Sequence, residues 1–593
     1  MKRSKFMAAV AGAAAISTLA ACGGGGGGNN NAPTTDDGFQ EGGAAGELKD
    51  PEAQGPADPI EGAEEGGTIN VLLPSPDTGP ATLDPTAGWS VTDNSILQNL
   101  VFRSLTTYKF DPETGEMVLV PDLATDLGTP NQDFTEWTFT IKDGIRWENG
   151  DPVTAEDVAF GIKRSLAGGD LQGPGSKYSK TYFAGAEDYN GPYEDGENYE
   201  AVTVDGNDIT IEMSQPFPEM DYWGSFMAMG PVPSGPEGEP PGYGQEPLAT
   251  GPYKVASFRP EVELVLERND EWDPETDPSR HQYPDEFVFQ FNQDTTTSDQ
   301  IMLSNNAESE TTILTALQGS SYQRATEELG DRVVSASQAC TGFFFPDYDK
   351  ITEKEVRQAL AFAYPYEDAA AAGGEIPGLT RTFGETILPP GMAGREEFDA
   401  IEGETMETNP EKARELLEAA GYADGEYEIR FLSQSGSPEG RAAADQIATA
   451  LEDAGFSTRI FDYDGSGYDV WTDPDNNIHK QLNVQQVAWC SDWPSGSTFI
   501  PALFETGQEY NTGGFSEPSV DEAISEVSSL PVEDQPAAWA ELDRTIMQDF
   551  FPVIPTGYYN NLFAYGERIG NFQNDAAQGF PNWRDMYVVP EGS

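Results

Sequence analysis

The chain has 593 residues, and 102 acidic side chains face only 32 Lys and Arg, which gives a formal net charge of −70. Because contacts with phosphate groups need a basic face, this balance argues against nucleic-acid binding and against attachment to anionic lipid head groups by charge. We interpret the acidity as surface solvation suited to a salty medium, in which screening removes the self-repulsion. A free energy of unfolding that is equal in low and molar salt would contradict this interpretation.

An export signal is predicted at the beginning of the chain. Basic residues within the first five positions precede an apolar run from Met7 to Thr18, which is too short to span a membrane as a stable helix. The following Leu19-Ala20-Ala21-Cys22 resembles the lipobox of bacterial lipoproteins. This resemblance implies that residues 1–21 are a signal peptide. It also implies that Cys22 becomes a lipidated N-terminus, which anchors the protein to the outer face of the cell membrane.

Residues 22–67 are predicted to form a disordered tether. They are rich in Gly, Ala, Pro, Asp and Glu and contain almost no large apolar residue, so they cannot bury enough surface to offset the entropy of ordering. The body from Thr68 to Ser593 is long for one domain and natural for two lobes.

The first half of this body contains several short predicted elements. Residues 68–73 are predicted as a strand and residues 93–105 as a helix. Trp137, Phe139 and Ile141 alternate with polar residues, which is the pattern of a half-buried strand.

Two helix starts carry capping signals. Thr154 is a predicted N-cap with Asp157 at the third helical position, a variant of the capping box, and the helix is predicted to end at Gly168-Gly169. Asn409-Pro410 combines a cap with proline in the first turn, and Gly421 ends that helix.

The second half alternates between the two kinds of structure. Residues 333–345 form a long extended run, and residues 353–372 are predicted as a helix. Strands at 427–431 and 456–461 flank a helix at 442–454, which together make a β-α-β unit with parallel strands. The sequence therefore predicts an α/β fold for this half.

The chain contains three cysteines. If Cys22 carries lipid, then Cys340 and Cys490 remain as a pair in an exported protein, where a disulfide is the default expectation. Catalytic or metal-binding thiols would need partners, and the two histidines, His281 and His479, are not near either cysteine in sequence.

The run from Pro121 to Leu166 resembles the signature region of family 5 extracellular solute-binding proteins, the peptide- and oligopeptide-binding proteins of ABC importers. It has an aromatic strand, Lys-Asp-Gly, a second aromatic residue, and Thr-Ala-Glu-Asp-Val before a helix. The similarity extends over residues 68–589. The sequence "DWPSGSTFIPALF" (492–504) is similar to that of family members from actinobacteria. Further matches follow in the family's order: "LDP" (83–85), "TGPYKV" (250–255), "LERNDEW" (266–272), "VRQALAFA" (356–363), "NPEKARELLEAAGY" (409–422), "PSVDEAISE" (518–526) and "FPVIP" (551–555).

This resemblance implies a two-lobed α/β fold of the periplasmic-binding-protein (Venus-flytrap) class, with an extra domain inserted in the first lobe. Lobe I is expected to be discontinuous, so that the C-terminal segment returns to it. The implied boundaries are 68–109, 214–335 and 562–593 for lobe I, 110–213 for its extra subdomain, and 336–561 for lobe II.

The resemblance also implies a site for the α-amine of a peptide. In the family, a loop with the pattern W-C-x-D-[YW] supplies the carboxylate that receives this amine, and Trp489-Cys490-Ser491-Asp492-Trp493 matches it. Asp492 is therefore the expected amine partner, although an arbitrary Asp in so acidic a chain would simply be solvated. Trp493 and Trp489 could add an apolar, cation–π wall; for Trp489 we favour packing in the core.

A disulfide is implied at the base of this loop. In some oligopeptide receptors the Cys of the loop bonds to a Cys that opens a strand with the pattern C-T-x-x-[YF], and Cys340 begins such a sequence. A Cys340–Cys490 bond would close a long loop and contribute up to roughly 4–5 kcal/mol in the entropic model.

The chain departs from the family pattern at the expected carboxylate end of the ligand. Some receptors carry an Arg just before the Trp, but Gln485-Gln486-Val487 stands there, without a cation. Arg381 is the basic candidate elsewhere in lobe II, with a surface ion pair as the alternative role. Tyr178 and Tyr182 lie in a segment that approaches the ligand in the family, and they are equally suited to packing.

The expected function is capture of extended peptides and their delivery to the permease of an ABC importer, by a monomer without cofactor or metal. A partial calcium-loop pattern at 462–473 is interpreted as chance in so acidic a chain. Two alternatives remain: the same fold binding an oligosaccharide or another small solute, and an exported hydrolase. The second is disfavoured because no hydrolase motif is present and two histidines leave few general bases.

Overall fold

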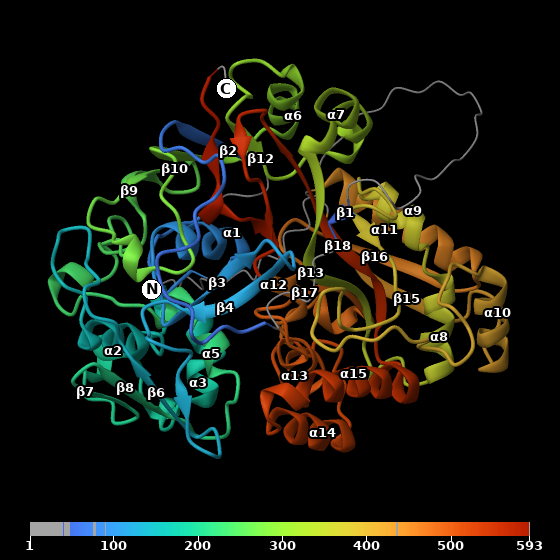
Figure 1. Cartoon of the computed structure of the whole chain (residues 1–593). Helices are drawn as coiled ribbons and strands as arrows, with labels where there is room; N and C mark the ends of the chain where they lie inside the picture. Colours follow the sequence, from blue (N-terminus) through green and yellow to red (C-terminus); the bar gives the residue numbers. More distant parts are fainter. Residues whose placement is uncertain (1–38, 41–47, 75–78, 89, 435–436, 592–593) are drawn as a thin grey trace, which may run out of the picture.

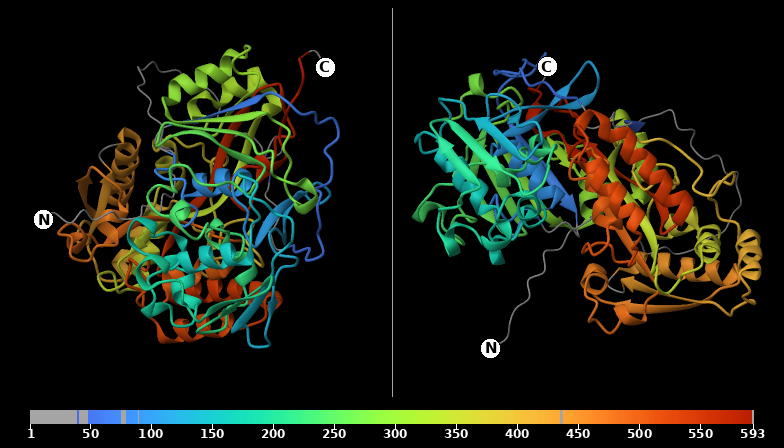
Figure 2. Two further views of the ribbon diagram at one scale, coloured as in Figure 1. Left: turned by 90° about the vertical axis from the view of Figure 1, so that its left-hand side faces the viewer. Right: turned by 90° about the horizontal axis from the view of Figure 1, so that it is seen from below.

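A computed structural model describes residues 39–40, 48–74, 79–88, 90–434 and 437–591. The predicted signal peptide and Cys22 lie outside the described residues. The described chain forms two α/β bodies that lie side by side and meet along the middle of the molecule (Figure 1; Figure 2).

One ten-stranded sheet runs through both bodies. Its longest strands are β13 (Val333–Pro346) and β18 (Ile554–Tyr565), which pair antiparallel. Figure 1 shows them crossing the middle of the molecule. β17 (Val484–Cys490) pairs with β13, and β14 (Arg381–Thr382) pairs with β18. The main path is, in order, β1 (Phe39–Gln40), β13 (Val333–Pro346), β18 (Ile554–Tyr565), β12 (Thr312–Leu314), β2 (Thr68–Pro74), β11 (Glu286–Gln293), β10 (Glu263–Arg268) and β9 (Tyr253–Arg259).

The pairing of β13 with β18 is interrupted in the middle. Ser337 pairs with Asn560, but the next paired residue of β13 is Cys340, opposite Tyr559. Ala339, inside this bulge, has a φ of 51°. We propose two boundaries between the lobes beside this bulge. The boundary 335/336 lies inside β13 and the boundary 561/562 lies inside β18. These boundaries define lobe I and lobe II below.

The described part of lobe I carries four further sheets. The first is four-stranded, in the order β5 (Thr129–Pro130), β6 (Glu136–Thr140), β8 (Asp208–Glu212) and β7 (Val202–Asp205), and the second pairs β3 (Thr106–Asp111) with β4 (Glu116–Pro121). Near the C-terminus, β19 (Ile569–Gly570) pairs with β22 (Tyr587–Val588) and β20 (Asn574–Asp575) with β21 (Phe580–Pro581). The helices of lobe I are α1 (Val91–Asp93), α2 (Ala155–Arg164), α3 (Ser179–Tyr182), α4 (Pro192–Asp195), α5 (Met220–Trp223), α6 (Thr295–Ser304) and α7 (Tyr322–Leu329).

Lobe II contains the predicted β-α-β unit. β15 (Glu428–Gln434) and β16 (Ser457–Tyr463) are parallel, as expected, and α11 (Pro438–Asp453) connects them. The other helices of lobe II are α8 (Lys354–Ala363), α9 (Tyr366–Ala372), α10 (Pro410–Ala419), α12 (Tyr468–Trp471), α13 (Ile500–Phe504), α14 (Pro518–Ser528) and α15 (Gln535–Thr545).

The large core clusters keep mostly to one lobe. The lobe II core consists of buried residues between Phe343 and Ile554. A lobe I core consists of buried residues between Leu105 and Met229, joined by one buried side chain from further along the chain, Trp493. Trp493 therefore crosses from one lobe into the core of the other.

Most local predictions are confirmed. β2 and β6 form where expected, and the capping box of Thr154 and Asp157 is present in both directions. Asn409 caps α10 by accepting from the amide of Lys412. The C-terminal segment returns to lobe I, where Tyr565 of β18 pairs with β12.

Two predicted helices differ from the observed ones. The helix at 353–372 is divided into α8 and α9, because Pro365 lacks an amide donor and keeps Tyr364 out of helical geometry. The helix at 93–105 begins instead at Val91 as α1, continues as one π-helical turn over Asn94–Gln98, and ends soon after it.

The prediction of a disordered tether over residues 22–67 is wrong for residues 39–40, which pair with β13 as β1, and for residues 48–67. Asp50 donates its amide to the carbonyl of Leu119, and the Ala57 amide donates to the carbonyl of Asp277. Lys49 forms an ion pair with Asp221 of lobe I. Composition reflects only the apolar surface available for burial, whereas backbone hydrogen bonds and an ion pair hold this segment.

Candidate functional site

β17 and the loop after it bring the predicted amine-binding motif to the junction of the lobes. Cys340 of β13 lies directly opposite Cys490 of β17, and the two are joined in a disulfide, as the resemblance implied. Alternate residues of a strand share a face, so Val487 and Trp489 point into the lobe II core while Gln486 and Ala488 point away from it. Asp492 follows in the loop that this disulfide fixes.

The Asp492 carboxylate meets two consecutive side chains of lobe I. Its Oδ2 lies 2.8 Å from Lys177 Nζ and also accepts a hydrogen bond from the Tyr178 hydroxyl. The side chains of Asp492 and Lys177 are 18% and 23% exposed, so the pair is largely shielded but within reach of water. An ion pair between the lobes therefore sits at the predicted amine site.

Aromatic faces surround the Lys177 ammonium group. Its Nζ is 4.8 Å from the ring centroid of Tyr178 and 4.9 Å from that of Trp489, within the range of cation–π attraction. Burial raises the pKa of the Tyr178 phenol well above its ordinary value, and Asp492 raises it further, so Tyr178 stays a neutral donor. A carboxylate and two ring faces together form a binding place for one ammonium group.

Trp489 has the structural role that we favoured together with a place in this site. It is buried in the lobe II core, and its Nε1 donates to the carbonyl of Thr498 at 2.7 Å. The ammonium group of Lys177 nevertheless approaches one face of its ring.

Trp493 lies inside lobe I, among the side chains of its core. Only 2% of it is exposed, and its ring centroid is 4.5 Å from that of Tyr178 and 6.4 Å from that of Tyr222, to which it is parallel. Nearby, the Ser497 hydroxyl donates to the carboxylate of Glu219, again between the lobes. Burial raises the pKa of Glu219, and hydrogen bonds from serine hydroxyls lower it again.

Tyr182 packs against the lobe I core. Its ring stacks on Phe217 with centroids 3.9 Å apart, and burial raises the pKa of its phenol. Its place in the described structure is that of a packing residue at the edge of the lobe I core.

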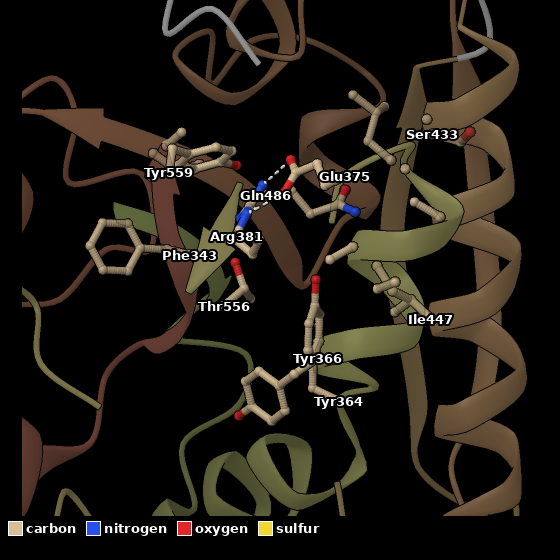
Figure 3. Close-up of a pocket in the computed structure, with 18 of the residues that line it drawn as sticks. Phe343, Tyr364, Tyr366, Glu375, Arg381, Ser433, Ile447, Gln486, Thr556 and Tyr559 are labelled. Atoms are coloured by element: carbon tan, nitrogen blue, oxygen red, sulfur yellow. Dashed lines mark hydrogen bonds and ion pairs between the residues drawn. The ribbon is translucent and has the colours of Figure 1, made fainter. Parts of the chain in front are cut away.

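A cavity of about 210 Å³ opens in lobe II beside β17. Its walls are mostly aromatic and small apolar side chains, with a few polar groups. Figure 3 shows Arg381 between Tyr559 and Glu375, with Tyr364 and Tyr366 on one side and Ile447 on another. The lining residues are Phe343, Tyr364, Tyr366, Ala369, Ala370, Gly373, Glu375, Arg381, Leu432, Ser433, Gly440, Ala443, Ile447, Tyr468, Trp471, Gln486, Val487, Ala488, Thr556 and Tyr559.

Arg381 is the cation of this cavity. Its Nε and Nη2 donate to the two oxygens of Glu375 at 2.7 and 2.6 Å, a bidentate pair that leaves Nη1 outside it. The guanidinium carbon stacks 3.4 Å from the ring centroid of Tyr559. Gln486, from the stretch Gln485–Val487 that holds no cation, lines the same cavity, so Arg381 reaches this region from a different strand.

Strand register gives the separation between the Asp492 loop and Arg381. Cys490 pairs with Cys340, Cys340 with Tyr559, and Tyr559 with Arg381, which are three steps across the sheet. At about 4.8 Å per step, the backbones of Cys490 and Arg381 are about 14 Å apart. A short extended peptide is long enough to reach from one to the other.

Several residues of this site carried no usable signal in the sequence. Lys177 lies in a Gly- and Pro-rich loop that reads as an irregular connection, and Glu375 is one of many acidic residues. Tyr559 is identified only through its cross-strand pairing with Arg381. Pairings over such long separations cannot be inferred from local patterns.

The described residues contain neither a membrane-spanning helix nor a metal-binding cluster. None of the described helices combines the length and the hydropathy that crossing a bilayer requires. No group of three or more His, Cys, Asp or Glu side chains in the described part is arranged to hold a metal ion.

Two α/β lobes that share a sheet, with charged and aromatic side chains gathered where they meet, define a two-lobed solute-binding protein. The chain belongs to the bacterial extracellular solute-binding proteins, family 5, whose model matches residues 118–511.

Individual relatives cover most of the chain at low identity. It is 23% identical to the dipeptide-binding protein DppE of Bacillus subtilis, over 84% of this chain and 88% of that one. It is 21% identical to the periplasmic oligopeptide-binding protein OppA of Escherichia coli, over 77% and 83%. Among solved structures, clavulanic acid biosynthesis oligopeptide binding protein 2 has a TM-score of 0.78 at 25% identity, over 91% of this chain and 99% of that one.

Proposed function

We propose that this protein is the substrate-binding component of an ABC importer and that it captures extended peptides between its two lobes. One observation carries the proposal. At the lobe junction, the Asp492 carboxylate and the ring faces of Tyr178 and Trp489 hold an ammonium group, that of Lys177. The names of the relatives DppE and OppA, which describe dipeptide and oligopeptide binding, support peptides as the solute.

The amine end of the peptide would bind at Asp492. A buried ammonium group needs a compensating charge, and a carboxylate flanked by aromatic faces supplies it. Tyr178 would hold the carboxylate in place through its hydroxyl. Trp493 and Tyr182 would act at a distance, Trp493 by docking the loop into lobe I and Tyr182 by supporting the aromatic cluster.

The other end of the peptide would reach the cavity of lobe II. Arg381 would meet the carboxylate through Nη1 while Glu375 keeps the guanidinium oriented. The aromatic and small apolar walls would accept side chains of varied shape, and water would fill the space that remains. This arrangement suits a receptor that tolerates varied peptide sequences.

The proposed setting is the outer face of the cell membrane. Cys22 would carry the lipid anchor, and the closed protein would deliver its peptide to the permease subunits as a monomer. We propose no catalytic activity and no cofactor for this protein.

Native mass spectrometry of the purified protein with a random peptide library tests the peptide proposal. Peptide adducts are expected. Their absence, together with binding of a cello- or chito-oligosaccharide, would favour the oligosaccharide alternative, for which the Tyr and Trp faces of the cavity are suited. In the Lys177→Met background, in which no lysine occupies Asp492, Asp492→Asn should weaken binding of a captured peptide at least tenfold, and a smaller loss would contradict the amine-binding role.

A further inference from the structure

Lys177 is held rigidly at the lobe junction. Its amide donates to the carbonyl of Pro174 at 3.0 Å, and its carbonyl accepts from the Thr181 hydroxyl. The preceding loop packs directly on the backbone of lobe I. A Cβ on Gly173 would lie 2.0 Å from the Thr86 oxygen, and a Cβ on Gly175 would lie 1.9 Å from the Ser165 oxygen. The loop therefore presents the Lys177 side chain from a fixed place.

The ammonium group of Lys177 occupies the place where a peptide amine would bind. Within the described chain, its hydrogen-bond partner is Asp492, at 2.8 Å, and the ring centroids of Tyr178 and Trp489 are 4.8 and 4.9 Å away. These are the carboxylate and the aromatic faces that the proposed function assigns to the ligand. A second ammonium group cannot share them without repulsion between like charges.

We propose that Lys177 is an internal competitor for the amine site and thereby a specificity-determining residue of this receptor. The inference rests on the proposed function. A peptide with a free α-ammonium must displace Lys177 from Asp492 and return its charge to water. A peptide with a blocked amino terminus leaves the Lys177–Asp492 pair in place. The wild-type protein therefore gains little affinity from a free amine.

The ion pair also joins the lobes, since Lys177 belongs to lobe I and Asp492 to lobe II. Lys177 thus replaces one contact that would otherwise require a ligand. Because both side chains retain some exposure, water and an incoming amine can reach the pair, and the exchange needs no unfolding of the core.

The test compares one peptide in two forms. The probe is the peptide captured most strongly from the library, prepared with a free and with an acetylated amino terminus, and the dissociation constants are measured by calorimetry. We expect the two forms to differ by less than about tenfold on the wild type. On Lys177→Met, the free peptide should bind more tightly than on the wild type, and the preference for the free form should grow at least tenfold.

Two further variants serve as controls. Lys177→Arg retains a cation and should behave as the wild type. Lys180→Met removes a neighbouring lysine that donates to the carbonyls of Ala186 and Tyr189, and it should leave the preference unchanged. An unchanged preference in Lys177→Met would overturn the inference. Failure of every peptide to bind would instead overturn the proposed function.

Amine labelling of the wild type gives an independent measurement. Acetic anhydride labelling, followed by peptide mapping, should show Lys177 protected relative to Lys180 in the empty protein. The free peptide should expose Lys177, and the acetylated peptide should not. Equal labelling of Lys177 with both peptides would also overturn the inference.

Discussion

The rings of Trp493 and Tyr178 lie with centroids 4.5 Å apart, although one belongs to the loop after β17 in lobe II and the other precedes α3 in lobe I. Trp493 is a buried member of the lobe I core cluster. The side chain therefore links the loop that carries Asp492 to the lobe that carries Lys177, and it contributes to closure of the lobes.

Trp493→Ala should weaken closure in the empty protein. Removing a buried Trp costs about 3–5 kcal/mol, and here that loss falls on contacts between the lobes. Small-angle scattering should show a larger radius of gyration than in the wild type. Trp539→Ala serves as the contrast, because Trp539 is equally buried but lies within the lobe II core. It should lower the melting temperature without enlarging the molecule. Equal radii for Trp493→Ala and the wild type would contradict this role.

Arg381→Met should reduce the preference for a free peptide carboxylate. The guanidinium is the cation of the lobe II cavity, so its loss should weaken binding of a free-acid peptide at least tenfold and leave the C-terminal amide almost unaffected. Arg430→Met is a control, since Arg430 does not line the cavity, is partly exposed and has its guanidinium 3.9 Å from the Glu428 carboxylate. If both forms of the peptide weakened equally, Arg381 would be a structural residue held by Glu375.

Removal of the disulfide should lower the free energy of unfolding. The bond joins residues separated by 150 positions, for which the entropic model gives up to about 5 kcal/mol. The double variant Cys340→Ala/Cys490→Ala should unfold at a lower urea concentration than the wild type. Peptide affinity should also fall, because the loop that carries Asp492 loses its fixed base. A midpoint equal to that of the wild type would show that the strand pairing alone holds this corner.

The elements that could be predicted are those with local signals. The capping box at Thr154 and the cap at Asn409 depend on residues three positions apart, and the parallel pair β15 and β16 follows from the periodicity of the β-α-β unit. Pro365 signals the break between α8 and α9, but the apolar pattern continues across it, so periodicity alone predicts one helix.

The site could be predicted only in part. The motif identified Asp492, but its partner Lys177 comes from the other lobe through tertiary structure alone. The motif likewise does not indicate that Trp493 is buried in lobe I. The same short motif is compatible with a Trp beside a ligand and with a Trp in a core. Arg381 was proposed from its charge, whereas its bidentate pair with Glu375 depends on the turn that leads into β14.

Asp543 should make the stability of lobe II depend on pH. Burial raises the pKa of its carboxyl to about 7, although the amides of Leu388 and Ile387 donate to it at 3.0 Å and lower the pKa in part. In the unfolded chain the carboxyl ionises near its ordinary pKa of about 3.9. Between these two values the unfolded state binds fewer protons than the folded state, so the free energy of unfolding falls as the pH rises from about 4 to about 7 and is level above that range.

Asp543→Asn cannot ionise and lacks this contribution. In urea titrations from pH 4 to pH 8.5, the wild type should therefore lose stability relative to the variant up to about pH 7, by an amount on the order of 4 kcal/mol. Parallel curves for the two proteins would show that the carboxyl is already ionised in the folded state at pH 4.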